Sequence, residues 1–193
     1  MPSVACIIAT TAKRTTLMDE VVMPSVIGQG FSEVVVLGAY HSGANYRHLP
    51  VAGVTRSTVD AQRNRDIGTM ATVSEWLVYL TDDHRLDLAF VARLHDLIHQ
   101  TGIARHDVVV PTRFTTRNDR RVPLPMGVED GYCAGHAGVF HRTAIQEVPW
   151  SVAPAHPNWD LLHSGMLLSR GYQLYPTSSL MIEDVEPGAT PWV

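Results

Sequence analysis

A short apolar segment in the middle of the chain ends in three side chains that could bind a metal ion. Residues 76–80 read Trp-Leu-Val-Tyr-Leu, which is typical of a buried strand, and Thr81 leads from them into Asp82, Asp83 and His84. In open α/β sheets, ligands bind at the carboxyl ends of the strands. Two adjacent carboxylates repel each other, and a divalent cation is the simplest partner for both. Carboxylate oxygens suit Mg²⁺ or Mn²⁺, especially where a phosphorylated substrate supplies further oxygen ligands.

An alternative is that this acidic pair caps a helix beginning near Leu88. Asp87 lies directly before that helix and already suits the cap position, so the sequence favours a metal site with Asp83 as its primary ligand. The same residues also form an Asp-x-His motif, in which Asp82 and His84 would contact the metal. The sequence leaves the choice between these two ligand sets open.

The order of motifs around this segment resembles that of the inverting glycosyltransferases with the A-type (GT-A) fold, in particular family 2, which includes cellulose and chitin synthases. Their pattern is Ala-x-x-Arg-Asn-x-Gly, a helix, an apolar strand and an Asp-x-Asp that holds the metal and the sugar nucleotide. This chain has Ala61, Arg63, Asn64 and Gly68, and residues 81–83 (Thr-Asp-Asp) stand where Asp-x-Asp would be. The glycine comes two residues later than in the family, and a threonine replaces the first acid. The Asp-x-His variant is found in transferases of N-acetylgalactosamine to protein.

The resemblance also gives the loop after the first strand a role in nucleotide binding. In the family this loop reads Pro-Thr-Tyr-Asn-Arg and contacts the nucleobase. Thr10 and Arg14 match its threonine and arginine, while its proline and tyrosine are missing. The family commonly carries an acid after its second strand that also binds the base, but residues 37–39 read Leu-Gly-Ala here. The resemblance therefore implies uridine only as the default nucleotide.

The start of the predicted helix over 61–75 carries further donor-binding candidates. The resemblance implies that Arg63 pairs with the diphosphate and that Asn64 holds the backbone of a loop. The alternative is a helix cap at Asp60 and a surface ion pair, which would stabilise the protein by at most about 1 kcal/mol.

The acceptor side of the resemblance lies in the second half of the chain. Residues 131–142 resemble the family's acceptor segment, in which small residues let a sugar lie against the backbone, so Gly135 and His136 are expected to contact the acceptor. A glycine-rich hairpin is an equally good explanation of this segment. Trp159, further along, would offer an apolar face to a sugar ring.

The catalytic base is expected at Asp160, where the family has an acid at the start of a late helix. A helix cap explains the same aspartate without catalysis, and Glu129 and Asp130 are the next candidates for the base. Glu183 and Asp184 occupy the region where some relatives place a last metal ligand, usually a histidine.

Alternating apolar strands and amphipathic helices position these residues. They predict an α/β fold, a single-domain nucleotide-binding sandwich over residues 1–193 with a mainly parallel sheet flanked by helices and right-handed crossovers. Residues 1–87 would bind the nucleotide sugar and 88–193 the acceptor. Neither Gly-x-Gly-x-x-Gly nor Gly-Lys-Ser/Thr follows the first strand, which disfavours dinucleotide-binding and P-loop proteins. Strands are expected at 4–9, 34–37, 51–54, 76–80, 108–110 and 139–140, and helices at 17–27, 61–75, 88–99 and 160–170.

Local residues refine these elements. Pro24 should kink or end the first helix, and the small residues Gly68 and Ala71 should let the second lie close to the sheet. The chain after 110 should be irregular as far as Gly138, and the tail, which carries Pro176, Pro187 and Pro191, should wrap the surface.

Length and composition fit one globular domain. The chain has 193 residues and a net charge of −4, so no overall positive field draws it to nucleic acid. No apolar run approaches the ~20 residues of a membrane span, and the start lacks the charged lead and cleavage site of a signal peptide. We therefore expect a cytoplasmic protein without a membrane partner. Cys6 and Cys133 lack metal-like spacing and are expected to be free, buried thiols.

Together these features predict a metal-dependent transferase that moves a sugar from a nucleoside-diphosphate sugar, by default a UDP-sugar, to a hydroxyl with inversion. Mn²⁺ or Mg²⁺ and an arginine would neutralise the departing diphosphate. One rival is a nucleotidyltransferase, which would normally have a Gly-rich loop and a lysine after the first strand, where this chain has only Lys13. The other rival is a non-catalytic binding module.

The acceptor is expected to be DNA or protein. Small viral relatives of the family glycosylate virion proteins or hydroxymethylated bases in viral DNA, and such a form would act in the host cytoplasm. The fourteen arginines against one lysine suit a GC-rich source such as an actinobacterium or one of its viruses. Four arginines in one polar stretch either contact DNA phosphates or belong to a solvated loop: Arg113, Arg117, Arg120 and Arg121.

Overall fold

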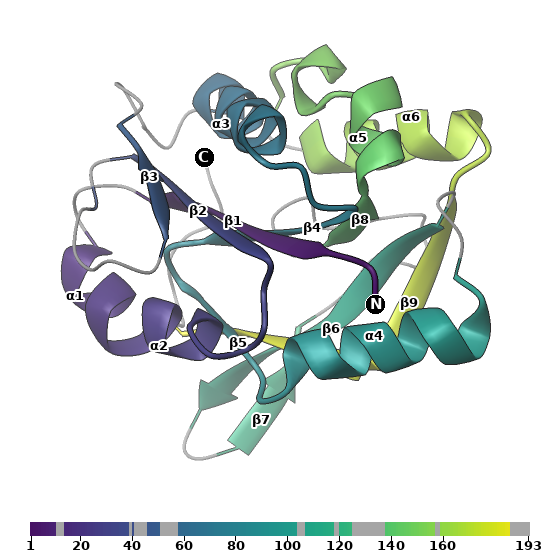
Figure 1. The fold of residues 1–193 in the computed structure, drawn as a ribbon. Coiled ribbons are helices and arrows are strands. Elements are labelled where there is room, and N and C mark those ends of the chain that lie inside the picture. The colour runs from purple at the N-terminus through teal and green to yellow at the C-terminus, as the bar shows by residue number, and fades with distance from the viewer. Residues whose placement is uncertain are drawn as a thin grey trace.

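Nine strands of the described chain form one sheet, with helices on both of its faces (Figure 1). The computed structural model describes residues 1–10, 14–38, 40, 46–50, 58–103, 107–117, 120–124, 138–156 and 159–185, and only the backbone of 58, 59, 116, 117 and 120 among them. The strands are β1 (Val4–Thr10), β2 (Glu33–Gly38), β3 (Arg47–Leu49), β4 (Trp76–Thr81), β5 (His84–Leu86), β6 (Asp107–Arg117), β7 (Arg120–Pro123), β8 (Val139–His141) and β9 (Gln173–Asp184). The helices are α1 (Thr15–Leu17), the π-helical turn η2 (Met18–Val22), α2 (Met23–Val26), α3 (Thr58–Ala71), α4 (Phe90–Thr101), α5 (Arg142–Glu147), the 3₁₀ turn η3 (Trp150–Val152) and α6 (Trp159–Ser169).

The sheet is mixed. Its strands follow the order β3-β2-β1-β4-β8-β6-β9-β5, and β7 pairs with β6 beside this path. Strands β3, β2, β1 and β4 are parallel to one another, as are β6 and β9. Strand β8 is antiparallel to β4 and β6, β5 is antiparallel to β9, and β7 is antiparallel to β6. The predicted α/β fold is confirmed, with parallel pairing confined to β3-β2-β1-β4 and to β6-β9.

Residues of β1 alternate between two hydrophobic cores, one on each face of the sheet. Cys6 and Ile8 belong to the core that α1, α2 and α4 cover, whereas Ala5 and Ile7 belong to the core under α3, α5 and α6 (Figure 1). Burial on both faces explains the continuous apolar sequence of this strand. Cys6 is a free thiol, as predicted, and its burial raises its pKa. Cys133 lies outside the described residues.

Helix α3 packs closely on the sheet at Gly68, as predicted. A Cβ atom on this glycine would lie 2.4 Å from Ile7 Cγ2 and 3.1 Å from Leu37 Cδ1, so only glycine allows this approach. Because α3 connects the parallel strands β3 and β4 by a crossover, its first turns lie near the carboxyl ends of those strands.

The first helical segment passes through a π-helical turn before Pro24. The Met23 N–H bonds to the Met18 carbonyl, and α2 then continues to Val26. Proline cannot donate a helical hydrogen bond. Pro24 was expected to kink or end this helix. In the structure the helix changes from π-helical to α-helical just before Pro24 and ends two residues after it.

Helix α4 begins at Phe90, and the prediction that Asp87 caps it is wrong. The Phe90 N–H donates to Gln29 Oε1 at 2.8 Å, while Asp87 Oδ2 accepts a hydrogen bond from Arg93 Nη1 at 2.9 Å. The preceding Ala89 has a left-handed conformation with φ 58°. A glutamine far away in the sequence thus takes the capping role.

Two further predictions for the second half of the chain are wrong. Strand β6 does not end near 110 but continues to Arg117 and forms a hairpin with β7, which projects from the lower side of the molecule in Figure 1. Residues 173–184, with Pro176, do not wrap the surface, because they form β9 between β6 and β5, whereas Pro187 and Pro191 lie outside the described residues. Pro176 lies within β9 opposite Val110 of β6, next to the point between Pro111 and Thr112 where the register of the two strands shifts. Strand β9 is mostly exposed in its first half, so no apolar pattern marked it.

The remaining predicted elements are present with shifted ends, except the expected strand 51–54, which lies outside the described residues. Strand β3, just before it, was not predicted. None of the described helices combines the length and apolar character needed to cross a membrane.

Candidate functional site

The two acids of the predicted metal site lie at the carboxyl ends of β1 and β4. These strands are parallel neighbours in which Ala9 pairs with Thr81, so Thr10 and Asp82 follow at the same edge of the sheet. Thr10 Oγ1 donates a hydrogen bond to Asp82 Oδ2 at 3.2 Å. The Thr81 hydroxyl donates to Asp83 Oδ1. Each carboxylate is therefore held by a threonine from the strand end.

Arg14 lies between these two carboxylates. Its Nη1 is 3.0 Å from Asp82 Oδ1 and 2.6 Å from Asp83 Oδ2, and its side chain is only 9% exposed. Burial alone would lower the pKa of Arg14, but the charges of both aspartates outweigh burial and raise it. For Asp83, burial raises the pKa, but the nearby His84 and hydrogen bonds lower it by more. The guanidinium and the carboxylate therefore stabilise each other in their charged forms.

His84 connects the acidic pair to the last strand. It lies opposite Asp184 in the antiparallel β5–β9 pairing, and its Nε2 is 3.2 Å from Asp184 Oδ1 and 4.0 Å from Asp83 Oδ1. Its Nδ1 accepts the Thr81 N–H at 3.3 Å, which assigns the proton to Nε2, facing Asp184. Arg113 Nε donates to Asp184 Oδ1 at 3.3 Å. Burial raises the pKa of Asp184, but His84 and Arg113 outweigh it and lower this pKa.

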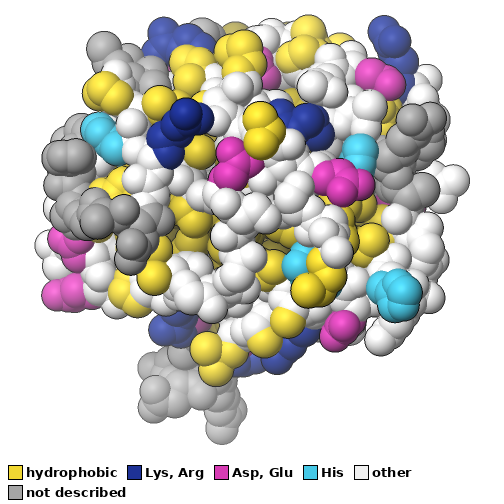
Figure 2. Space-filling view, viewed as in Figure 1, with side chains coloured by type: hydrophobic (Ala, Val, Ile, Leu, Met, Phe, Trp, Pro, Cys, Tyr) yellow, Lys and Arg dark blue, Asp and Glu magenta, His cyan; other side chains and the backbone are white. Residues whose placement is uncertain are grey.

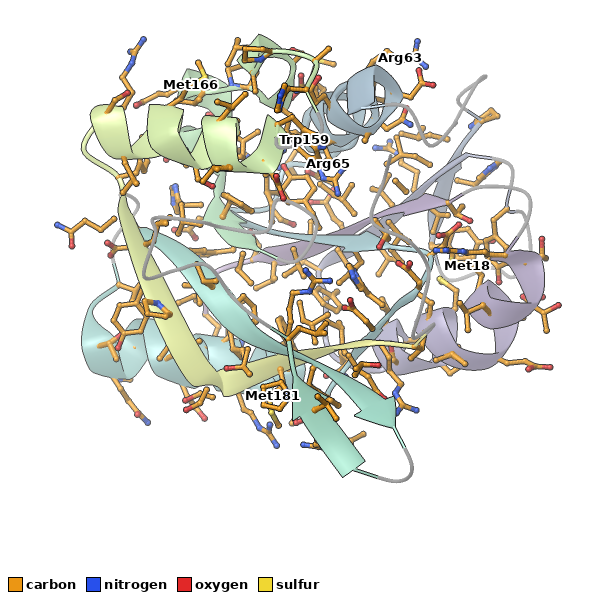
Figure 3. The ribbon with its side chains drawn as sticks, turned by 180° about the vertical axis from the view of Figure 1, so that it is seen from behind. Met18, Arg63, Arg65, Trp159, Met166 and Met181 are labelled. Atoms are coloured by element: carbon orange, nitrogen blue, oxygen red, sulfur yellow. The ribbon has the colours of Figure 1, made fainter. Side chains whose placement is uncertain are left out.

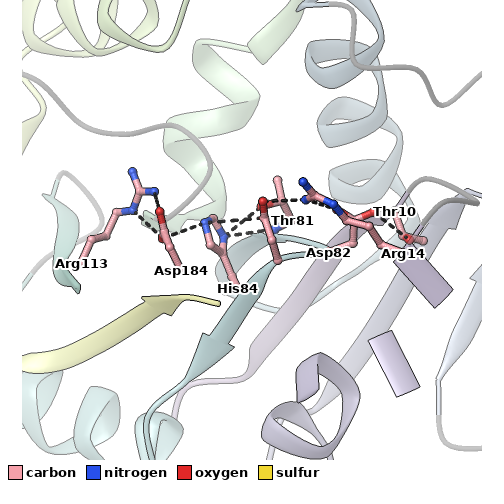
Figure 4. Close-up of polar contacts among 8 residues, drawn as sticks. Thr10, Arg14, Thr81, Asp82, His84, Arg113 and Asp184 are labelled. Atoms are coloured by element: carbon pink, nitrogen blue, oxygen red, sulfur yellow. Dashed lines mark hydrogen bonds and ion pairs between the residues drawn. The ribbon is translucent and has the colours of Figure 1, made fainter. Parts of the chain in front are cut away.

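Figure 4 shows these contacts as one continuous network of side chains across the sheet edge. We call its three acids, Asp82, Asp83 and Asp184, the acidic cluster. The network draws on strands from both halves of the chain, because β9 comes back beside β5 and β6. In order across the sheet it contains Arg113, Asp184, His84, Thr81, Asp83, Arg14, Asp82 and Thr10.

Glu183 lies on the other side of the β5–β9 pairing from the acidic cluster. Successive residues of a strand face opposite sides of the sheet, and Glu183 bonds to Arg85, with Arg85 Nε 2.9 Å from Glu183 Oε2. Both line a separate cavity of about 720 Å³ between α2, β5 and the start of α4. Of the two neighbouring acids in the tail, the structure therefore brings only Asp184 to the candidate site.

The two arginines near the start of α3 have opposite environments. Arg63 points away from the sheet, as Figure 3 shows, and its Nη2 is 3.2 Å from Asp60 Oδ1 with a side chain 48% exposed. Arg65 is buried, and its Cζ lies 5.7 Å from the ring centroid of Trp150 and 5.0 Å from that of Trp159. Burial lowers the pKa of Arg65 to about 10. The arginine that faces the interior is thus not the one that the sequence analysis selected.

Motif spacing could have identified Arg65. In the family pattern the glycine follows the arginine by three positions, and Arg65 and Gly68 have this spacing whereas Arg63 does not. In this frame Asp66 takes the place of the family's asparagine. Its carboxylate accepts the N–H groups of residues 150 and 151 at 2.8 and 3.0 Å, so it fastens η3 to α3.

Asn64 is completely buried, and its amide nitrogen and oxygen have no hydrogen-bond partner within the described part of the chain. A buried polar group without a partner destabilises the folded state by about 1–3 kcal/mol. Because the first turns of α3 lie near the carboxyl ends of the strands, this amide is a candidate to bind a ligand or a loop backbone.

Asp160 lies in the first turn of α6. Its side chain is nearly buried, and Oδ1 accepts the N–H of Leu161 at 2.9 Å. Burial lowers the pKa of Arg65, and Asp160 is one of the groups that oppose this effect. Trp159 packs edge-on against Trp150 with ring centroids 5.6 Å apart, so neighbouring side chains cover its ring.

The four arginines of the polar stretch 113–121 do not form one surface among the side chains that the structure describes. Arg113 is only 13% exposed and is bound to Asp184, so it belongs to the network of Figure 4. Arg121 lies 4.8 Å from the Phe114 ring centroid with a side chain 59% exposed. For Arg117 and Arg120 only the backbone of the hairpin is described. Other predicted candidates fall outside the described residues altogether: Lys13, Glu129, Asp130, Gly135 and His136.

The residue types at the acidic cluster fit a hard divalent cation. Carboxylate oxygens of Asp83 suit Mn²⁺ or Mg²⁺, with diphosphate oxygens as further ligands. Both ring nitrogens of His84 are already bonded within the protein, Nδ1 to Thr81 and Nε2 to Asp184. Across the described ranges, no three His, Cys, Asp or Glu side chains are arranged to hold an ion by themselves. A metal ion here would thus depend on oxygen atoms of a substrate, and Arg14 would have to release Asp83.

Comparison with solved structures identifies the fold. No protein-family profile and no curated protein matches the sequence. The structure of GalNAc-T7 with UDP, GalNAc and Mn²⁺ matches with a TM-score of 0.70 and 14% identity, over 96% of this chain and 44% of that one. S. aureus TarS 1–349 in complex with UDP-GlcNAc matches with a TM-score of 0.70 and 13% identity, over 97% and 60%. The chain therefore has the GT-A fold of these glycosyltransferases and spans less than two thirds of either neighbour.

Proposed function

We propose that this GT-A chain transfers a sugar from a UDP-sugar to a hydroxyl group, with a divalent metal ion and with inversion at the sugar carbon. The observation that carries the proposal is the network of Figure 4, which gathers the acidic cluster, Arg14 and His84 at the carboxyl ends of β1 and β4. This is where α/β sheets bind ligands. The solved neighbours hold UDP with Mn²⁺, or UDP-GlcNAc, which supports a uridine nucleotide as the donor.

On the donor side, Asp83 would hold the metal ion, whose charge would stabilise the departing diphosphate. His84 would join it as a ligand only after its Nε2 has released its proton and its contact with Asp184. Asp82 and Thr10, which are bonded to each other, would bind the nucleotide sugar beside it. The unsatisfied amide of Asn64 would gain its missing partner from the donor or from a loop that closes over it. We do not assign Arg63 to the diphosphate, because it faces solvent and pairs with Asp60.

On the acceptor side, Asp160 would act as the general base that removes the proton of the attacking hydroxyl. The hydrogen bond from Leu161 N–H orients its carboxylate, and Arg65 supplies a positive charge nearby. Gly135 and His136 would surround the acceptor sugar or hydroxyl. Trp159 is not assigned to the acceptor, because Trp150 and Arg65 pack against its ring.

For the acceptor itself we propose a hydroxyl on DNA or on protein. The β6–β7 hairpin projects from the body of the molecule in Figure 1 and carries Arg117, Arg120 and Arg121 in its sequence. On the face shown in Figure 2, acidic and basic side chains of the described residues are interspersed. Contact with an acidic polymer would be made by these hairpin arginines.

Thermal unfolding with nucleotides tests the donor assignment. UDP and a UDP-sugar should raise the melting temperature, and more so with Mn²⁺, because a ligand that binds only the folded state stabilises it. Asp83→Asn should abolish the metal-dependent part, whereas Asp60→Asn, at a surface ion pair, should leave it unchanged. Stabilisation by nucleoside triphosphates alone would favour a nucleotidyltransferase. Absence of any nucleotide response would reject the proposal in favour of a binding module.

A further inference from the structure

Arg14 occupies the position that a metal ion on the acidic pair would need. Its Nη1 is 2.6 Å from Asp83 Oδ2 and 3.0 Å from Asp82 Oδ1. A Mg²⁺ ion lies about 2.0–2.1 Å from its ligand oxygens, so an ion on Asp83 Oδ2 would fall in the space of the guanidinium. Repulsion between two cations is poorly screened in a site as buried as this one. The metal ion and Arg14 therefore exclude each other at these oxygens.

All four oxygens of the acidic pair already have hydrogen-bond partners. Thr10 and Thr81 each bond to one oxygen of Asp82 and Asp83, respectively, and Arg14 bonds to the other oxygen of both. The two threonines come from the strand ends and do not contact the oxygens that Arg14 binds, Asp82 Oδ1 and Asp83 Oδ2. Arg14 must consequently move before an ion can reach the two oxygens that it contacts, Asp82 Oδ1 and Asp83 Oδ2.

We propose that Arg14 is a phosphate-binding residue that holds the metal position until the sugar nucleotide arrives. This inference rests on the proposed function. The donor's diphosphate offers the guanidinium a second set of anionic oxygens, to which arginine binds in a bidentate manner. When Arg14 turns to the diphosphate, Asp82 and Asp83 become available to the metal ion. The guanidinium and the metal ion then lie on the same diphosphate.

The location of Arg14 allows this movement without displacement of a strand. It directly precedes α1, its backbone is non-helical with φ −121° and ψ 29°, and its long side chain alone reaches the acids. A rotation about the side-chain bonds is sufficient to exchange one anionic partner for another. Metal and donor should therefore bind cooperatively, each strengthening the other by the same factor.

Direct measurement of Mn²⁺ binding tests the exchange without any assay of transfer. Mn²⁺ affinity of the free protein would be measured by electron paramagnetic resonance, with and without UDP, for the wild type, Arg14→Gln and Arg63→Gln. Arg14→Gln should bind free Mn²⁺ about 10-fold more tightly, or better, because the competing cation is gone, and UDP should then strengthen Mn²⁺ binding less than in the wild type. Arg63→Gln removes a guanidinium that does not contact the acidic cluster and should behave as the wild type.

Two further variants make the result interpretable. Arg14→Gln combined with Asp83→Asn should lose the added Mn²⁺ affinity, which locates the ion on the acidic pair. Arg14→Lys keeps the positive charge but places it on a single nitrogen atom, so its Mn²⁺ affinity should lie between those of the wild type and Arg14→Gln. This variant also provides the comparison with the wild type if Arg14→Gln does not fold. A folded Arg14→Gln protein with wild-type Mn²⁺ affinity and wild-type coupling to UDP would overturn the proposal. If no variant binds UDP, the proposed function fails, while the comparison of free Mn²⁺ affinities still decides whether Arg14 competes with the metal.

Discussion

His84 and Asp184 face each other across the β5–β9 pairing, with Nε2 of the histidine 3.2 Å from Oδ1 of the aspartate. The partners of Asp184 lower its pKa although burial opposes this. A carboxyl group with a lowered pKa in the folded state contributes stability above its unfolded pKa of about 3.9, and this contribution is lost as the pH falls through the folded value.

Asp184→Asn should therefore remove part of the acid sensitivity of the protein. The free energy of unfolding, measured with urea at pH 6, 5, 4 and 3, should fall less steeply below pH 4 in the variant than in the wild type. At pH 6 the variant should be the less stable protein, because His84 and Arg113 lose their carboxylate. Parallel curves for the two proteins would show that the pairing contributes nothing to acid stability.

Burial of His163 should make the free energy of unfolding depend on pH in a second, higher range. Its Nε2 lies 2.8 Å from the Val148 carbonyl, its ring stacks on Trp150 at 4.0 Å, and burial lowers its pKa to about 4. The unfolded chain binds a proton near pH 6.5 and the folded chain does not, so stability should fall as the pH decreases from 6.5 to 4. This loss is of order 3 kcal/mol at most. His163→Gln should be less stable at pH 7 but should lack this slope in urea unfolding, and an unchanged slope would exclude His163 as its source.

Gly68→Ala should destabilise the fold. The added methyl group would meet Ile7 Cγ2 at 2.4 Å, and overpacking of this kind costs about 1–3 kcal/mol. Gly165 in α6 is a matched control, because a Cβ there has nothing within 4 Å. Gly165→Ala should stabilise the protein by about 0.5–1 kcal/mol through its higher helix propensity. Chemical denaturation of the three proteins measures both changes, and equal effects of the two substitutions would contradict the close approach of α3.

Asp160→Asn should separate catalysis from donor binding. The amide preserves the size of the side chain and can still accept the Leu161 N–H, so stability should change by less than the ~1 kcal/mol of a lost helix cap. If Asp160 is the base, transfer should fall by about 10²-fold or more, while the affinity for UDP in calorimetry stays near that of the wild type. Transfer at the wild-type rate would leave Asp160 with a structural role alone.

The hairpin arginines should make any DNA binding steeply salt-dependent. Lys and Arg contacts to phosphates release counterions, at a slope of about −0.9 per contact for duplex DNA. Replacement of Arg117, Arg120 and Arg121 with alanine should flatten this slope without changing hydrolysis of the sugar nucleotide. Arg113→Ala should instead disturb the site, because that arginine binds Asp184. Failure of the wild type to bind DNA at low salt would favour a protein acceptor.

The sequence predicted those parts of the fold that local patterns encode. Strand β4 and the acids after it were predicted from a continuous apolar segment that ends in charged residues, and Gly68 from its place in a helix pattern. Strand β9 was missed because its first half is mostly exposed and contains a proline and several polar residues. Its pairing with β5 is a tertiary effect, so the contact between His84 and Asp184 could not be derived from the sequence.

Tertiary packing also decides which of two arginines in the helix motif faces the interior. Arg63 and Arg65 are alternatives within one motif, and only their positions on the packed helix show which one is buried beside Trp150 and Trp159. Arg14 was expected near the nucleobase from its position in the loop, whereas its contact with both acids requires β1 and β4 to be adjacent.

Strand β9 also determines when the network of Figure 4 can form during synthesis of the chain. A nascent chain that has left the ribosome only as far as α6 already contains Arg14 and residues 81–84, but it lacks the carboxylate that lies between His84 and Arg113. The network closes only when β9 docks beside β6 and β5. The network of Figure 4 can therefore form only after almost the whole described chain has been made.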